Sequence, residues 1–298
     1  MHGSVSTKLA ELEPLSPGGR RWPALLGVAL SVAMAAGLAF QLLGTGLAGL
    51  RRAVPDQPLF YLLFAGLYAL PPLADYLIFR RLWRIPIAGL AALAKKRIAN
   101  EVLFGYSGEA YFYAWARSRS RMIAAPFGAV KDVTIQSAMA GNAATLAAVA
   151  VALPFAWTLL TETQARGLLI SGAVVVVMTL PFLLFSRRVF TLDRKRLWWI
   201  FAVHMGRIVL GALLLAFAWA VALPGIAVGV WLMLSAARLL VSRLPFLPNK
   251  DLLFANAAIL LIGRDHALAD LLAVTAALTL CAHAMLLAGF GLRAVARA

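Results

Sequence analysis

Long apolar runs, separated by short polar and mostly basic segments, dominate the chain. A helix needs about 20 apolar residues to cross the roughly 30 Å hydrocarbon core of a bilayer. The pattern predicts seven such spans, at about 23–49, 57–79, 129–160, 167–186, 197–222, 226–243 and 267–291. Two adjacent prolines, Pro71 and Pro72, lie inside the second span and predict a kink or a break there, because they remove backbone donors.

Two regions do not follow the pattern of full-length spans. Residues 98–116 are apolar but interrupted by glycine, serine and glutamate, and basic clusters flank them on both sides. Residues 244–265 combine a Pro- and Asn-containing turn, a short apolar piece and a polar end. Broken apolar segments that enter and leave on one side are typical of re-entrant hairpins. The sequence therefore predicts two of them, the first with its tip at Gly105–Gly108.

The composition agrees with a membrane location. Hydrophobic residues make up 62% of the 298 residues, charged residues only 13%, and the mean hydropathy is +0.86. Soluble domains are near 45–50% apolar and about 25% charged, so a soluble enzyme and a disordered protein are both excluded. The predicted fold class is an all-α polytopic membrane protein of about seven transmembrane helices and two re-entrant hairpins. A polar tail at 1–22 precedes a single membrane domain at 23–298.

Positive charge is in large excess, with 28 Lys and Arg against 12 Asp and Glu. Basic residues collect in cytoplasmic loops of membrane proteins, and most of the basic clusters fall on one side of the predicted topology. The distribution predicts a cytoplasmic N-terminus in a membrane of the bacterial cytoplasmic (inner) type. It gives no reason to expect a nucleic acid partner.

Motifs for enzyme chemistry are absent from the sequence. It contains no GxSxG, HExxH, CxxC or Walker pattern, and its four histidines have no metal-ligand spacing. We therefore expect no metal and no cofactor, and the sequence favours a non-enzymatic role without excluding an enzyme.

Polar residues within the apolar segments are the candidates for function, because charges at membrane depth are costly and usually face a cavity or a partner. Glu109 follows Gly108 at the predicted helix break and is the strongest candidate, whereas Glu101 has Lys96 and Arg97 beside it to pair with. Two acid–base pairs at the mouths of apolar segments are further candidates, with either local charge neutralisation or headgroup binding as their role: Lys131-Asp132 and Lys250-Asp251.

Two arginines, Arg207 and Arg238, lie inside predicted spans. Both can snorkel to the interface, and the alternative role for both is a phosphate contact in a groove, for which Arg238 is the stronger candidate. Asp75 and Asp270 lie nearer the helix ends, where structural pairing is expected.

The segment from Asn100 to Ala110 resembles the Asn-x-x-x-Pro-x-x-x-Gly-Glu motif of the lysylphosphatidylglycerol synthase transmembrane-domain family, which is flippase-like. The segment Leu244–Asp251 is similar to that family's Leu-Pro-x-Pro-Gly-Gly segment. Asn100, Gly108, Glu109 and Pro248 match, whereas the first motif's proline and the second motif's two glycines do not. The resemblance implies a membrane domain that moves phospholipids with anionic or modified headgroups between leaflets.

Three functions follow from these patterns. The first is a lipid translocase or headgroup-binding transporter, because short Gly- or Pro-interrupted segments in two halves of a chain indicate a binding site at mid-membrane. The second is a non-catalytic membrane subunit that scaffolds a complex with a membrane protein partner. The third is an integral-membrane transferase that uses a lipid-linked donor, with Glu109 as base.

Overall fold

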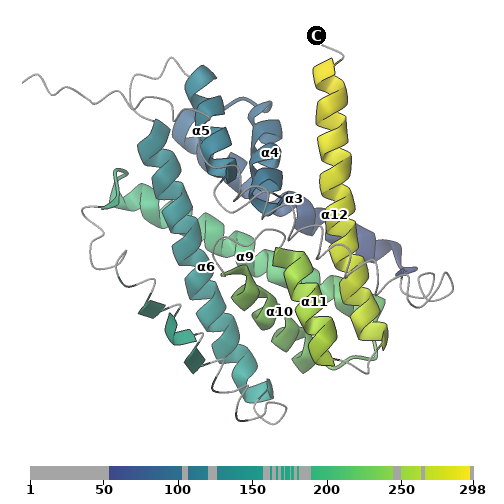
Figure 1. Ribbon diagram of the computed structural model, residues 1–298. Coiled ribbons are helices and arrows are strands. Elements are labelled where there is room, and N and C mark those ends of the chain that lie inside the picture. The colour runs from purple at the N-terminus through teal and green to yellow at the C-terminus, as the bar shows by residue number, and fades with distance from the viewer. Residues whose placement is uncertain are drawn as a thin grey trace, which may run out of the picture.

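All regular elements in the described residues of the computed structural model are α-helices (Figure 1). The structure describes residues 54–102, 107–119, 126–156, scattered positions between 162 and 180, and residues 189–243, 250–262 and 266–295. The helices are α3 (Pro58–Trp83), α4 (Gly89–Val102), α5 (Ser107–Arg119), α6 (Pro126–Ala156), α9 (Arg194–Ala222), α10 (Val228–Ser242), α11 (Lys250–Ile262) and α12 (His266–Val295).

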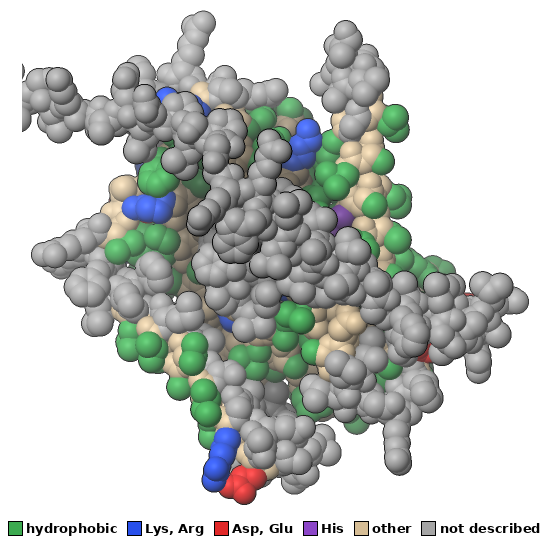
Figure 2. Space-filling view, viewed as in Figure 1, with side chains coloured by type: hydrophobic (Ala, Val, Ile, Leu, Met, Phe, Trp, Pro, Cys, Tyr) green, Lys and Arg blue, Asp and Glu red, His purple; other side chains and the backbone are tan. Residues whose placement is uncertain are grey.

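Four of these helices are long and apolar enough to cross a membrane. They contain the spans Pro58–Trp83, Phe127–Val151, Arg194–Ala222 and Ala267–Phe290. Large apolar side chains remain exposed on them, including Leu62 at 70%, Phe217 at 65% and Met285 at 74%, and Figure 2 shows hydrophobic side chains along the outer flanks of the described surface. These exposed faces suit contact with lipid chains, so we treat the protein as an integral membrane protein.

The predicted number of seven spans is not confirmed. The spans at 23–49 and, for the most part, 167–186 lie outside the described residues. The span predicted at 226–243 is α10, whose 15 residues are fewer than the 20 or so that a crossing requires. The two prolines do not break the second span, because α3 continues through Pro71 and Pro72.

The two largest apolar cores of the described residues lie at opposite ends of the helix bundle, and a smaller one lies between α11 and α12. The first, which we call the basic-end core, gathers the end of α3 and the beginning of α9 around Phe79, Phe112 and Ile200. Exposed basic residues of these helix ends surround it: Arg80, Arg81, Arg84, Arg194, Lys195 and Arg196. The second, the opposite-end core, gathers the beginning of α3 and the end of α9 around Phe60, Trp219 and Phe254.

Helices α3 and α9 pack side by side in antiparallel directions. A Cβ on Gly66 would lie 3.8 Å from Leu214, one on Gly211 would lie 3.6 Å from Leu67, and the Arg81 guanidinium lies 4.4 Å from the ring centre of Trp199. The middle turns of both helices lie between the two cores, so their side chains can line a cavity instead of a packed apolar core.

Candidate functional site

Helices α4 and α5 form a hairpin that extends from the basic-end core toward the middle of the bundle. The Ser107 hydroxyl donates to the Ala99 carbonyl at 2.7 Å, and the Gly108 N–H donates to Asn100 Oδ1 at 2.7 Å. Asn100 thus satisfies one of the free N–H groups at the start of α5. Glycine is needed at 108, because a Cβ would lie only 2.0 Å from the Lys96 carbonyl oxygen.

Helices α10 and α11 form a second hairpin, which extends from the opposite-end core toward the same place. The Lys250 ammonium donates to the Ser242 carbonyl at 2.8 Å, and Arg238 pairs with Asp251 at 2.9 Å across the two arms. The sequence predicted a re-entrant segment at 244–265, and its short apolar piece corresponds to α11, which runs from Lys250 to Ile262. The insertion of either hairpin into a membrane stays a prediction.

The inner ends of both hairpins open onto one cavity of about 940 Å³. Along α3 its lining runs from Phe64 to Asp75, and along α9 from His204 to Ala212, so the cavity lies between the two apolar cores. Five of the candidate residues from the sequence line it: Asn100, Glu109, Arg238, Lys250 and Asp251. Glu109 and Lys250, from different hairpins, therefore face the same cavity.

A buried ammonium group joins three helices on one wall of the cavity. Lys96 of α4 pairs with Asp75 of α3 at 2.7 Å and with Glu109 of α5 at 3.4 Å. The second carboxylate oxygen of Glu109, Oε2, is buried and has no hydrogen-bond partner among the described residues. Glu109 thus has unused acceptor capacity at the cavity wall.

A second charged group joins α4 to α12 and α3. Arg97 pairs with Glu101 at 2.7 Å, and the other oxygen of Glu101 lies 3.1 Å from His283 Nε2. The guanidinium of Arg97 also donates to the backbone carbonyl of Tyr68. In a helix this carbonyl would accept from the N–H four residues later, but that residue is Pro72, so Arg97 replaces the missing donor.

The remaining cations of the wall come from α9 and the second hairpin. Arg207 donates to the Ser137 hydroxyl of α6 at 3.1 Å. Arg243 packs against α6 where that helix has Gly141, and a Cβ there would lie 1.9 Å from the guanidinium. Small residues on α6 were expected to allow close helix packing, and at Gly141 the close neighbour is this arginine.

Positive charge exceeds negative charge in the cavity. Six cations and four carboxylates line its described part: Lys96, Arg97, Arg207, Arg238, Arg243 and Lys250 against Asp75, Glu101, Glu109 and Asp251. Side chains at its rim are partly exposed, with exposed fractions of 24% for Arg238 and 29% for Asp251. The described lining thus has two more cations than carboxylates, and a cavity of this charge attracts an anion.

Three candidate residues lie away from the cavity wall. Gly108 packs behind it against α4, as described above. Asp132 is fully buried near the start of α6 and accepts hydrogen bonds from the Thr191 N–H, the Thr191 hydroxyl and the Leu192 N–H at 2.7–2.8 Å. Lys131 donates to the Val189 carbonyl. This pair anchors the segment that leads into α9.

Sequence reasoning gave several cavity residues structural roles only. Asp75 was placed near a helix end, and Lys96 and Arg97 were treated as a basic boundary. One available signal was the Pro71-Pro72 pair, since proline frees backbone carbonyls that need donors from elsewhere, and Arg97 donates to the Tyr68 carbonyl.

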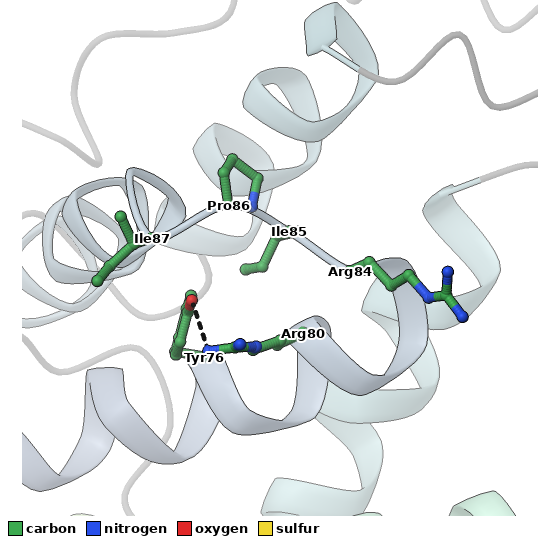
Figure 3. Close-up of a pocket in the computed structure, with 6 residues that line it drawn as sticks. All are labelled: Tyr76, Arg80, Arg84, Ile85, Pro86 and Ile87. Carbon is green, nitrogen blue, oxygen red and sulfur yellow. Dashed lines mark hydrogen bonds between the residues drawn. The ribbon is translucent and has the colours of Figure 1, made fainter.

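A second, smaller pocket of about 490 Å³ lies at the turn between α3 and α4 (Figure 3). Tyr76 and Arg80 form its floor and are joined by a hydrogen bond of 3.4 Å. Ile85 points toward them and the Arg84 side chain points away. With two arginines and no carboxylate among its lining residues, this pocket offers less varied chemistry than the central cavity. In the described residues, no group of three or more His, Cys, Asp or Glu side chains is placed to hold a metal ion.

Comparisons with protein-family models, with curated proteins and with solved structures find no significant match to this chain. The resemblance to the lysylphosphatidylglycerol synthase transmembrane-domain family therefore stays a prediction.

Proposed function

We propose that the protein binds the anionic headgroup of a membrane phospholipid in the central cavity and carries it between the two leaflets. The observation that supports this most is the excess of cations in a cavity enclosed by membrane-type helices. A phosphate in the cavity would contact Arg238 and Lys250, while the acyl chains remain along the apolar helix flanks.

The charge arrangement suits a ligand that enters and leaves. Three of the six cavity cations are paired with carboxylates: Lys96 with Asp75, Arg97 with Glu101 and Arg238 with Asp251. The carboxylates reduce the cost of placing these cations at membrane depth, and the remaining positive charge is moderate. Transport requires a site that binds well enough to be entered but not so well that the ligand stays.

The proposal is tested by reconstitution into liposomes that contain a fluorescent anionic phospholipid. The protein should speed the exchange of label between leaflets. Lys250→Gln should slow it about tenfold, equivalent to about 1.4 kcal/mol of headgroup binding. Arg166→Gln is the control, because Arg166 pairs with Glu162 on the exposed surface and does not line the cavity. No exchange above empty liposomes, or equal loss in both variants, contradicts the proposal.

A further inference from the structure

The described helices repeat one order twice. Helices α3 to α6 have 26, 14, 13 and 31 residues, and helices α9 to α12 have 29, 15, 13 and 30. In both series a long helix is followed by a hairpin of two short ones and a second long helix. We name the series unit 1 (58–156) and unit 2 (194–295).

A single shift of 142 residues relates the contacts of the two hairpins. It takes Lys96 and Glu109 to Arg238 and Asp251, so each hairpin has a cation on its first arm paired with a carboxylate 13 residues later on its second. It also takes the bond from Gly108 to Asn100 onto the bond from Lys250 to Ser242, each spanning eight residues. Two independent contacts thus agree on one register.

The same shift relates the two apolar cores. Phe112 and Val130 of the basic-end core correspond to Phe254 and Leu272 of the opposite-end core. It also pairs two hydroxyl residues of the cavity wall, Ser137 and Thr279. Each unit therefore builds one core at one end of the bundle and contributes its hairpin tip to the shared cavity.

The two units have opposite orientations. Their first helices, α3 and α9, are antiparallel and cross near Leu67 and Gly211. The shift takes Ala69 of α3 to Gly211 of α9. The two helices therefore cross at equivalent positions of the two units, and this crossing lies beside the cavity. An approximate two-fold axis then lies in the membrane plane, as expected for inverted-topology repeats with a binding site between them.

The contacts between the units are equivalent in position but not in packing. The shift takes Glu101 to Arg243 and Gly141 to His283. Arg243 of the second hairpin contacts Gly141 on α6, and Glu101 of the first hairpin contacts His283 on α12. Helix α6 packs closely on α9 and α10, whereas α12 meets α3 and α4 through long side chains such as Lys95 on Phe290. In Figure 1 the C-terminal half of α12 stands apart, and residues 284–288 are exposed while their counterparts 142–146 are not.

We propose that the protein is an inverted repeat that works by alternating access. We call the interfaces between α6 and α10 and between α4 and α12 the two seams; in the present arrangement the α6–α10 seam is closed and the α4–α12 seam is open. Closing the α4–α12 seam and opening the α6–α10 seam would exchange the roles of the two units and expose the cavity to the other side of the membrane. The assignment of the carried ligand rests on the proposed function, but the repeat and its two states do not.

The inversion is tested by cysteine labelling in a Cys281→Ser background. Ile87→Cys lies in the α3–α4 turn, where the side chain is 78% exposed, and Gly225→Cys lies in the equivalent α9–α10 turn, where a Cβ meets no atom within 4 Å. A membrane-impermeant maleimide should label the two variants from opposite sides of the membrane. Labelling of both from the same side overturns the inverted repeat.

Alternating access is tested at the two equivalent cavity positions, Ser137→Cys and Thr279→Cys, with an impermeant thiosulfonate. Both should react from one and the same side. The native Lys95 ammonium lies 4.9 Å from the centre of the Phe290 ring. Cross-linking the seam through Lys95→Cys and Phe290→Cys should make the two cavity cysteines react from the other side of the membrane instead. Reaction from the same side, from both sides or from neither after cross-linking overturns the proposal. Correct switching without lipid exchange would contradict only the proposed ligand.

Discussion

At the scale of single residues, the cavity is defined by side chains that share partners. Lys96 lies between two carboxylates, at 2.7 Å from Asp75 and 3.4 Å from Glu109. The shorter contact is a charge-assisted hydrogen bond, while the longer one leaves Glu109 Oε2 buried and without a partner in the described structure. Glu109 is therefore the member of this group with most freedom to respond to a ligand.

We expect Glu109→Gln to lower lipid exchange about tenfold while the protein stays folded, since the amide keeps the size of the side chain and removes only its charge. The matched variant is Glu101→Gln. Glu101 pairs with Arg97 at 2.7 Å and lies 3.1 Å from His283 Nε2, so this variant should lose thermal stability instead, because Arg97 loses its carboxylate partner. Lipid exchange in liposomes and the melting temperature in detergent measure the two effects. If both variants lose exchange equally and melt at the same temperature, Glu109 and Glu101 do not have different roles.

A second prediction concerns the position of Arg243. In Gly141→Ala the new methyl group would lie 1.9 Å from the guanidinium, which is the flexible end of the side chain and will shift. Exchange should fall several-fold with no change in charge, because the cation is displaced in the cavity. Gly206→Ala on α9 is the control, because a Cβ there meets no atom within 4 Å. Unchanged exchange in Gly141→Ala would show that the place of Arg243 is unimportant.

At the scale of elements, the sequence predicted the long helices well and the hairpins in part. Apolar length alone locates α3, α6, α9 and α12, since a span needs only enough apolar residues. The tip of the first hairpin was predicted at Gly105–Gly108; α4 ends at Val102 and α5 begins at Ser107, so Gly108 lies in the first turn of α5. The sequence assigned α10 to a full span and only α11 to the second re-entrant segment, because α10 is apolar enough to resemble a full span. The predicted span began at 226, whereas α10 begins at Val228, because no polar residue separates Ile226 and Ala227 from the helix.

The prolines in α3 give a prediction that apolar patterns alone do not supply. Arg97 donates to the Tyr68 carbonyl, which Pro72 leaves without its usual donor. In Pro72→Ala the helix can satisfy this carbonyl itself, so Arg97 should matter less. A double-mutant cycle with Arg97→Met should give a coupling of about 0.5–3 kcal/mol in unfolding free energy, the range for residues in one hydrogen-bond network. Additive effects would show that the two residues act independently.

At the scale of the whole molecule, the arrangement of charge was only partly accessible from the sequence. Glu109, Arg238 and Lys250 were predicted to line a groove because charges at membrane depth need a reason to be there. The pairing of Asp75 with Lys96 and of Glu101 with His283 links residues 21 and 182 positions apart, and no local pattern indicates such contacts. Lys131 and Asp132 were candidates for headgroup binding, but they anchor the segment that leads into α9. A charged pair at a helix start suits either role, so the sequence alone did not separate them.

The central claim is that the cavity between the two hairpins holds a lipid headgroup. The most direct test is a structure of the protein in nanodiscs that contain an anionic phospholipid. We predict phosphate density in the cavity, within hydrogen-bond distance of Arg238 or Lys250, with acyl-chain density continuing along the apolar helix flanks. A cavity that holds only water, or one filled by side chains of a partner protein, would contradict the account.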